Sequence, residues 1–162
     1  MTPVKAVNHI GIAVRSIDAQ RPFYEGTLGA LFEGTETVPD QKVRVGFFRV
    51  GDVRLELLEP TDPSSTVTAF LEKRGEGLHH IAFTVERIED RIAELKGGGL
   101  RMIDDTPRPG AHHMRVAFLH PKSTSGVLTE LCEPSRVAPE GARTTRLVNR
   151  QPQWRGLSAS LL

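Results

Sequence analysis

Cysteine and long apolar runs are both scarce in this sequence. Cys132 is the only cysteine among 162 residues, which excludes an intramolecular disulfide and any metal site built from several cysteines. No apolar run is long enough to cross a membrane, and the start MTPVKAVNHI lacks the apolar core of a signal peptide. Hydrophobic residues at 38% and charged residues at 25% are typical of a globular protein in water. We therefore expect a cytoplasmic protein.

An excess of one sign of charge is also lacking. The chain has 21 Lys and Arg against 20 Asp and Glu, a net charge of +1, so we expect no nucleic acid or membrane partner. The charge is unevenly distributed, because residues 135–162 contain five arginines and only one acid, Glu140. That segment carries +4 of the total, which leaves −3 for residues 1–134. It has no hydrophobic period, and we expect a basic, mobile C-terminal extension there.

The sequence repeats itself, and a duplicated unit decides the fold. Each matched stretch is short, rich in β-branched or aromatic residues and bounded by Gly, Pro or charge, so each predicts a strand. The first two pairs are 71 residues apart and the third is 74 apart, with the extra residues in the loop 121–126. The matching pairs are 8–14 with 79–85, 43–48 with 114–119, and 53–60 with 127–134.

Each copy also has a helix after its first strand. In 86–96, Ile88, Ile92 and Leu95 form an apolar stripe that ends at three glycines. Residues 16 to about 28 are the counterpart, where Pro22 predicts a late start or a kink.

The expected domain is residues 1–134. It comprises one β-α-β-β-β module at about 4–60, a linker helix at about 64–74 and a second module at about 76–134. We expect an α+β fold in which the two tandem modules form one curved mixed sheet around a metal-binding cleft.

Two histidines and two glutamates recur at matched places in the copies. Strand alternation places His9 with small neighbours on one face and the bulky residues on the other, and His80 likewise. Glu56 and Glu130 are carboxylates in apolar strands, costly to bury unless a cation meets them. The four make an N₂O₂ set that suits Zn, Co, Ni, Mn or Fe. In the doublet His79–His80 alternation predicts rings on opposite faces, and the repeat offset selects His80.

These patterns resemble the vicinal oxygen chelate superfamily, which includes glyoxalase I and the extradiol dioxygenases and is built from paired β-α-β-β-β modules that hold a divalent metal. Within it the chain is most similar to the methylmalonyl-CoA epimerase family, over nearly all of residues 4–134. The most specific signals are the segment Gly77-Leu78-His79-His80-Ile81-Ala82 and the run from His120-Pro121-Lys122 to Glu130-Leu131. Other similar segments are 8–14, 38–43 and 107–112.

The resemblance implies an isomerase that epimerises an acyl-CoA thioester with a divalent metal, Co²⁺ in the first place. His9, His80 and Glu130 match the family's metal ligands, and the fourth position falls at Glu56. Some bacterial epimerases have glutamine there, whereas glyoxalase I has glutamate. Gln41 and Lys122 are the candidate substrate-binding residues. The resemblance also implies a homodimer.

One family residue has no counterpart in this chain. The bacterial epimerases have a second catalytic glutamate a few residues after the position of Gln41, and here residues 42–46 read KVRVG. Epimerisation needs a base on each side of a planar enolate. We therefore expect Glu56 and Glu130, from opposite modules, to act as the two bases as well as ligands, with at least one of them bound weakly during turnover.

Three other functions remain open within the superfamily. Glyoxalase I has the same His, Glu, His, Glu set and also transfers a proton. An extradiol dioxygenase needs two histidines, one carboxylate and open positions, one of which Glu56 fills. A metal-free small-molecule-binding module would have no reason to keep four polar side chains in apolar strands. We interpret Cys132 as a small buried apolar residue, and three further histidines as loop residues: His112, His113 and His120.

Overall fold

The computed structural model describes residues 3–135, so the predicted basic extension lies outside the described residues except for Ser135. The first half contains β1 (Ala6–Ala13), α1 (Ile17–Arg21), β2 (Leu31–Val38), β3 (Val43–Val50) and β4 (Val53–Pro60). After α2 (Thr66–Arg74), the second half contains β5 (Gly77–Thr84), α3 (Ile88–Gly97), β6 (Arg108–Pro109), β7 (Met114–Leu119) and β8 (Thr129–Pro134). The described helices include none that is both long and apolar enough to span a membrane.

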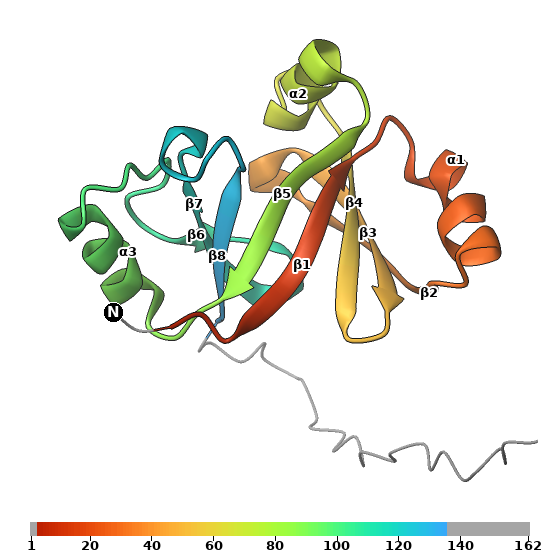
Figure 1. The fold of residues 1–162 in the computed structure, drawn as a ribbon. Coiled ribbons are helices and arrows are strands. Elements are labelled where there is room, and N and C mark those ends of the chain that lie inside the picture. Colours follow the sequence, from red (N-terminus) through yellow and green to blue (C-terminus); the bar gives the residue numbers. More distant parts are fainter. Residues whose placement is uncertain (1–2, 136–162) are drawn as a thin grey trace, which may run out of the picture.

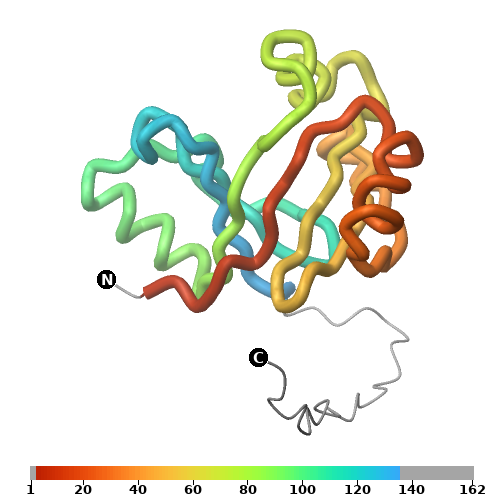
Figure 2. Tube along the Cα trace, turned by 45° about the vertical axis from the view of Figure 1, so that its right-hand side comes forward, coloured from red at the N-terminus to blue at the C-terminus, as the bar shows by residue number. Residues whose placement is uncertain are grey.

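All eight strands form one curled mixed sheet with the order β2-β3-β4-β1-β5-β8-β7-β6. β1 pairs with β4 and β5 pairs with β8 in parallel, whereas β1 and β5 pair antiparallel at the centre. Figures 1 and 2 show β1 and β5 side by side, with α1 and α3 on the outer sides of the two halves. The α+β fold of paired β-α-β-β-β modules predicted from the sequence is confirmed.

α1 and α3 pack on the outer face of the sheet, so most of the inner face is left for a cavity. α3 packs through Ile88, Ile92 and Leu95 against β7 and β8, and α1 packs through Ile17 against β3 and β4. α2 differs, because its Val67 and Leu71 pack with inner-face residues of β3 and β4. This linker helix therefore closes one end of the inner face, as Figure 1 shows near the label α2.

Matched glutamates at the ends of β4 and β8 cap the helices of their own halves. Glu59 accepts a hydrogen bond from the Ile17 N–H at 2.6 Å, and Glu133 accepts one from the Arg87 N–H at 2.8 Å. These N–H groups have no partner within the helix, and a carboxylate there also meets the positive end of the helix dipole. The duplicated Glu-Pro ending of the strand therefore fixes where each helix begins.

Two prolines make the halves unequal. Pro22 has no N–H, so α1 ends at Arg21 and the chain continues as a π-helix over Pro22–Thr27, with the Leu28 N–H bonded to the Phe23 carbonyl. The predicted kink at Pro22 therefore takes the form of a wider turn. In the second half, Pro109 limits β6 to two residues, because proline cannot donate to the ladder.

Candidate metal centre and active site

Four neighbouring strands each contribute one polar side chain to the inner face. His9 lies on β1, Glu56 on β4, His80 on β5 and Glu130 on β8, and at most 6% of each residue is exposed. The ladder explains the convergence, because Gly11 is the partner of both Glu56 and His80, while Ala82 is the partner of both His9 and Glu130. The four residues predicted from the repeat therefore line one cavity.

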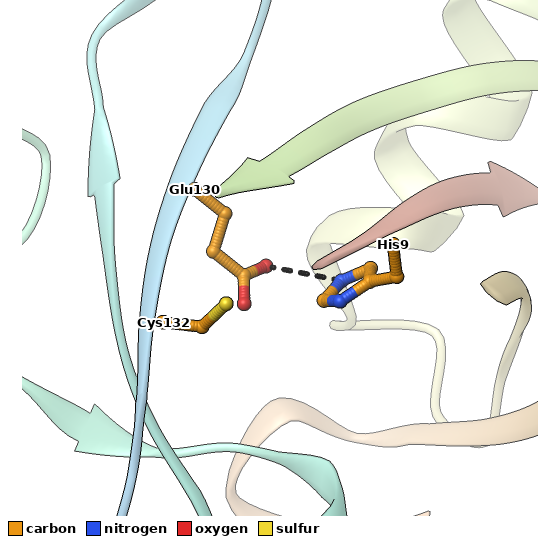
Figure 3. A group of neighbouring side chains, drawn as sticks. All are labelled: His9, Glu130 and Cys132. Atoms are coloured by element: carbon orange, nitrogen blue, oxygen red, sulfur yellow. Dashed lines mark ion pairs between the residues drawn. The ribbon is translucent and has the colours of Figure 1, made fainter. Parts of the chain in front are cut away.

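Three ligand atoms of this group form a compact triangle. His9 Nε2 lies 2.9 Å from His80 Nε2, His80 Nε2 lies 3.0 Å from Glu130 Oε2, and His9 Nε2 lies 3.8 Å from the same oxygen. Atoms that share one cation at bonds of about 2.0–2.2 Å stand about 3–3.6 Å apart. Figure 3 shows the Glu130 carboxylate aimed at the His9 ring across the gap between β8 and β1.

Glu56 approaches the other side of the His9 ring. Its Oε1 lies 3.6 Å from His9 Nδ1, whereas Glu130 faces Nε2. The two carboxylates thus lie on opposite sides of one imidazole, and Glu56 is not part of the triangle in this conformation. The sequence predicts the same inner face for both glutamates, and their unequal placement comes from the tertiary structure.

Burial shifts all four groups toward their neutral forms. It raises the pKa of Glu56 to about 8, with the Glu130 charge adding to the effect, and raises the pKa of Glu130 to about 7. It lowers the pKa of His9 and of His80 to about 4. Neutral imidazoles present lone pairs, and the carboxylates lack a nearby positive charge strong enough to offset their burial. A divalent cation fits this donor set, because it offsets the two negative charges.

Each site histidine has its second ring nitrogen held by the residue that precedes it. His9 Nδ1 lies 3.0 Å from Asn8 Oδ1, and His80 Nδ1 lies 2.9 Å from His79 Nδ1. Simple alternation predicts that the rings of His79 and His80 lie on opposite faces, and this prediction is wrong. The β1–β5 register shifts between Gly11 and Ile12, whose partners are His80 and Leu78, so His79 is left out of the pairing. Such a bulge re-aims a side chain.

Cys132 lies below the site on the same strand as Glu130. One ligand atom from each of His9, Glu130 and Cys132 lies within 4.8 Å of the others, and Figure 3 shows the sulfur beside the Glu130 carboxylate. Burial raises the pKa of the thiol to about 12, and Sγ donates to the Phe83 carbonyl at 3.3 Å. The thiol therefore stays protonated, in keeping with the packing role expected from the sequence.

The cavity in front of the four residues has a volume of about 180 Å³ and draws walls from both halves. Gln41 lines it, and the Gln41 Nε2 donates to the Pro109 carbonyl at 3.1 Å. Lys122 is exposed in the turn Pro121–Ser123 and lies outside the residues that line this cavity. The structure thus brings Gln41 to the site and leaves Lys122 away from it.

His112 lines the same cavity, although we interpret it from the sequence as a loop residue outside the site. Its ring stands against Phe47 with centroids 3.9 Å apart, and its backbone N–H donates to Glu36 Oε2 at 3.0 Å. Both His112 and His113 have left-handed backbones, with φ of 52° and 54°, which is uncommon for residues other than glycine. The turn Pro39–Gln41 before β3 is its counterpart in the first half, and Gln41, 71 residues before His112, lines the same cavity, so the repeat offset is a signal that could have found His112.

A second cavity of about 410 Å³ adjoins the first and shares four lining residues with it, among them His79 and His80. α2 contributes Phe70 together with the cationic side chains Lys73 and Arg74, and the segment before β8 contributes Val127. The two cavities therefore meet at these shared residues, and the second has a basic edge on α2.

Residues 8–118 match the family model of the Glyoxalase/Bleomycin resistance protein/Dioxygenase superfamily. The chain belongs to this superfamily. The resemblance stated from the sequence motifs is therefore confirmed. The match covers the first module and the second as far as Phe118, with His9 and His80 inside it and β8 beyond its end.

Relatives within the superfamily match over most of the chain. An uncharacterized protein of Bacillus subtilis (strain 168) is 50% identical over 128 residues, which cover 79% of this chain and 91% of that protein. The ethylmalonyl-CoA/methylmalonyl-CoA epimerase of Cereibacter sphaeroides is 39% identical over 127 residues, covering 77% and 95%. A variant of Streptomyces coelicolor methylmalonyl-CoA epimerase, solved with 2-nitronate-propionyl-CoA, has a TM-score of 0.79 at 39% identity, covering 85% of this chain and all of that one.

Proposed function

We propose that this chain is a metal-dependent methylmalonyl-CoA epimerase, an isomerase that interconverts the (R) and (S) forms of its thioester substrate. The observation that carries the proposal is the convergence of two imidazoles and two carboxyl groups, from repeat-matched positions, in one buried cavity. The names of the epimerase relatives from C. sphaeroides and S. coelicolor support the choice of substrate.

His9, His80 and Glu130 would hold a divalent metal ion, with Glu56 as the fourth ligand. Their mutual distances and their neutral imidazoles support this assignment. The bound ion supplies a Lewis acid that stabilises negative charge developing on the thioester oxygen. Co²⁺ is the ion that the family resemblance favours, and the N₂O₂ donor set suits it.

Glu130 and Glu56 would supply the two proton-transfer groups. One carboxylate removes the proton from the carbon between the two carbonyl groups, and the other returns a proton to the opposite face. Their positions on either side of the His9 ring support this two-sided arrangement. Glu56 lies outside the triangle of ligand atoms, which suits a weakly held carboxylate that is free to accept a proton.

The two adjoining cavities would divide the substrate between them. About 180 Å³ is below the roughly 300–1,000 Å³ of sites that enclose a drug-sized ligand, so the inner cavity suits the acyl group alone. The second cavity, with Lys73 and Arg74, offers a path for the pantetheine arm and a positive charge near the phosphates. Gln41 would contact the acyl end, and Lys122 would act only at the outer, nucleotide end, since it is exposed.

Solvent-deuterium exchange into each epimer of methylmalonyl-CoA tests the proposed bases. In D₂O, Glu56→Gln should preferentially lose proton exchange from one epimer and Glu130→Gln from the other. Each single variant should abolish epimerisation. Glu72→Gln, on the exposed side of α2, is the control. Full exchange of both epimers by either site variant would show that its carboxylate is not a base.

Glyoxalase I is the second candidate, because glutamate rather than glutamine stands at position 56. Parallel assays on methylmalonyl-CoA and on the methylglyoxal–glutathione adduct separate the two enzymes. A binding module without catalysis would retain ligand affinity but give no turnover with any added divalent metal. The proposal also includes a cytoplasmic homodimer, and sedimentation of the purified protein measures its oligomeric state.

A further inference from the structure

Asn8 and His79 occupy equivalent places in the two halves of the chain. They are 71 residues apart in the sequence, the same offset that relates His9 to His80. Both are left out of the regular β1–β5 ladder, because the register shifts between Val7 and His9 and again between Gly11 and Ile12. Each shift turns a side chain toward the inner face, and both residues line the inner cavity.

Asn8 holds the Nδ1 side of His9. Asn8 Nδ2 donates to Thr84 Oγ1 at 3.0 Å, so its Oδ1 is the atom that faces His9 Nδ1, also at 3.0 Å. A carbonyl oxygen only accepts, which requires the proton of the neutral imidazole to be on Nδ1. The lone pair is then on Nε2, which points at His80 and Glu130.

His79 makes the corresponding contact to His80. Its Nδ1 lies 2.9 Å from His80 Nδ1, and its ring is held edge-on against Phe70 with centroids 4.9 Å apart. Without a cation, the 2.9 Å contact between the Nε2 atoms of His9 and His80 needs a proton on one of them. With a cation on both Nε2 atoms, the proton of His80 is on Nδ1 and His79 Nδ1 accepts it. Histidine and asparagine can do this equally, because Nδ1 of one and Oδ1 of the other are both bonded to Cγ.

We propose that Asn8 and His79 are a matched pair of positioning residues, each accepting the Nδ1–H of the histidine that follows it and so presenting Nε2 as the metal ligand. This inference rests on the metal site of the proposed function. It assigns a role to two cavity residues that are not among the four proposed metal ligands. Partners of this kind orient ligand rings and set their tautomers, and their loss typically costs about 10- to 100-fold in metal affinity.

Substitutions that exploit the equivalence of the two positions test the inference. Asn8→Leu and His79→Leu remove the acceptor at similar volume, whereas His79→Asn copies the partner found in the other half. Zn²⁺ affinity, measured by chelator competition on the folded protein, should fall about 10- to 100-fold in each leucine variant and stay within about threefold in His79→Asn. His113→Asn is the control, at an exposed left-handed position that asparagine tolerates.

The tautomers give a readout besides metal affinity. Two-bond ¹⁵N–¹H spectra should show His9 as the Nδ1–H tautomer in the metal-free protein, and both His9 and His80 as Nδ1–H tautomers when Zn²⁺ is bound. An Nε2–H tautomer of His9 without metal, or of either ring with Zn²⁺ bound, would overturn the inference, as would leucine variants that bind Zn²⁺ like the wild type. Failure of the wild type to bind any divalent metal would instead overturn the proposed metal site, and the metal-free spectra would still decide the tautomer of His9.

Discussion

Gly11 and His80 are cross-strand partners on β1 and β5, and the His80 ring fills the space that a side chain at Gly11 would need. A Cβ at Gly11 would lie 2.2 Å from His80 Cε1 and 2.4 Å from His80 Nδ1. The equivalent pair in the same ladder is His9 with Ala82. Each site histidine therefore faces a small residue of the other half, and this is how two rings reach the same point on the inner face.

Replacing Gly11 by alanine should expel His80 from the site. We expect Gly11→Ala to weaken divalent-metal binding at least about tenfold and to cost about 1–3 kcal/mol of unfolding free energy, because a packed ring must move. Isothermal titration with Co²⁺ and urea unfolding measure the two effects. Gly26→Ala, where an added Cβ meets nothing within 4 Å, is the matched control. Unchanged metal affinity in Gly11→Ala would contradict the assignment of His80 as a ligand.

The metal-free protein should lose stability as the pH rises above neutrality. The folded-state pKa values of Glu130 and Glu56, about 7 and 8, lie above the ordinary 4.5, so their contribution is complete below pH 4.5 and is lost as the pH rises through 7 to 8. His9 and His80 act in the opposite sense, since their lowered pKa values favour the folded state above pH 6.5 and this is lost as the pH falls toward 4.

Urea unfolding at a series of pH values measures this profile. We expect a maximum between about pH 5 and 6.5 without metal. The decrease in the free energy of unfolding on the alkaline side should disappear in the double variant Glu56→Gln/Glu130→Gln. It should also disappear on saturation with a divalent cation, whereas Glu72→Gln should retain it. A profile that stays level from pH 6 to 9 in metal-free wild type would show that the carboxyl groups are not held protonated by burial.

Charge reversal on α2 should weaken binding of the CoA part of the substrate and leave kcat nearly unchanged. Lys73→Glu/Arg74→Glu removes the cationic edge of the second cavity, so KM for methylmalonyl-CoA should rise about tenfold with kcat nearly unchanged. The corresponding N-acetylcysteamine thioester has no nucleotide, so its KM should be the same in the wild type and the variant. The double variant Lys5→Glu/Lys96→Glu makes the same change of −4 in net charge away from both cavities and is the control. Equal KM values for methylmalonyl-CoA in the wild type and in Lys73→Glu/Arg74→Glu would show that the CoA nucleotide binds elsewhere.

Glu133, which caps α3, should contribute to the stability of the fold. Glu133→Gln keeps the shape but removes the charge that meets the Arg87 and Ile88 N–H groups and the Arg115 guanidinium, so we expect a loss of about 1–2 kcal/mol in urea unfolding. Glu86→Gln, an exposed carboxylate paired with Lys5, should change stability by less than about 0.5 kcal/mol. Equal effects from both substitutions would show that α3 does not need this cap.

The inner-face residues were predictable because duplication and strand alternation are properties of the sequence. Both point to His9, His80, Glu56 and Glu130, and the structure brings all four to one cavity. The placement of His79 was not predictable in this way. Its bulge depends on the register between β1 and β5, strands that are 71 residues apart, and no local pattern contains that register.

His112 illustrates a second kind of residue that sequence reasoning missed. It lies on a loop of the second half, yet its ring packs on Phe47 of β3 and its backbone N–H donates to Glu36 of β2. Loop residues have no hydrophobic period, so strand alternation could not find His112, although Gln41 is its repeat partner; the packing of one half against the other places the ring at the cavity. The adjoining cavity beside α2 has the same origin.

The duplicated sequence by itself determined the fold class and which side chains point away from the helices, because a period of two and a repeat offset need no knowledge of distant contacts. Only the tertiary structure decided how those side chains meet: which carboxylate faces Nε2 and which faces Nδ1 of His9, and which neighbours hold the imidazoles. The reason is physical. Those distances depend on the register and curl of strands from both halves, and register is set by the packing of the whole sheet.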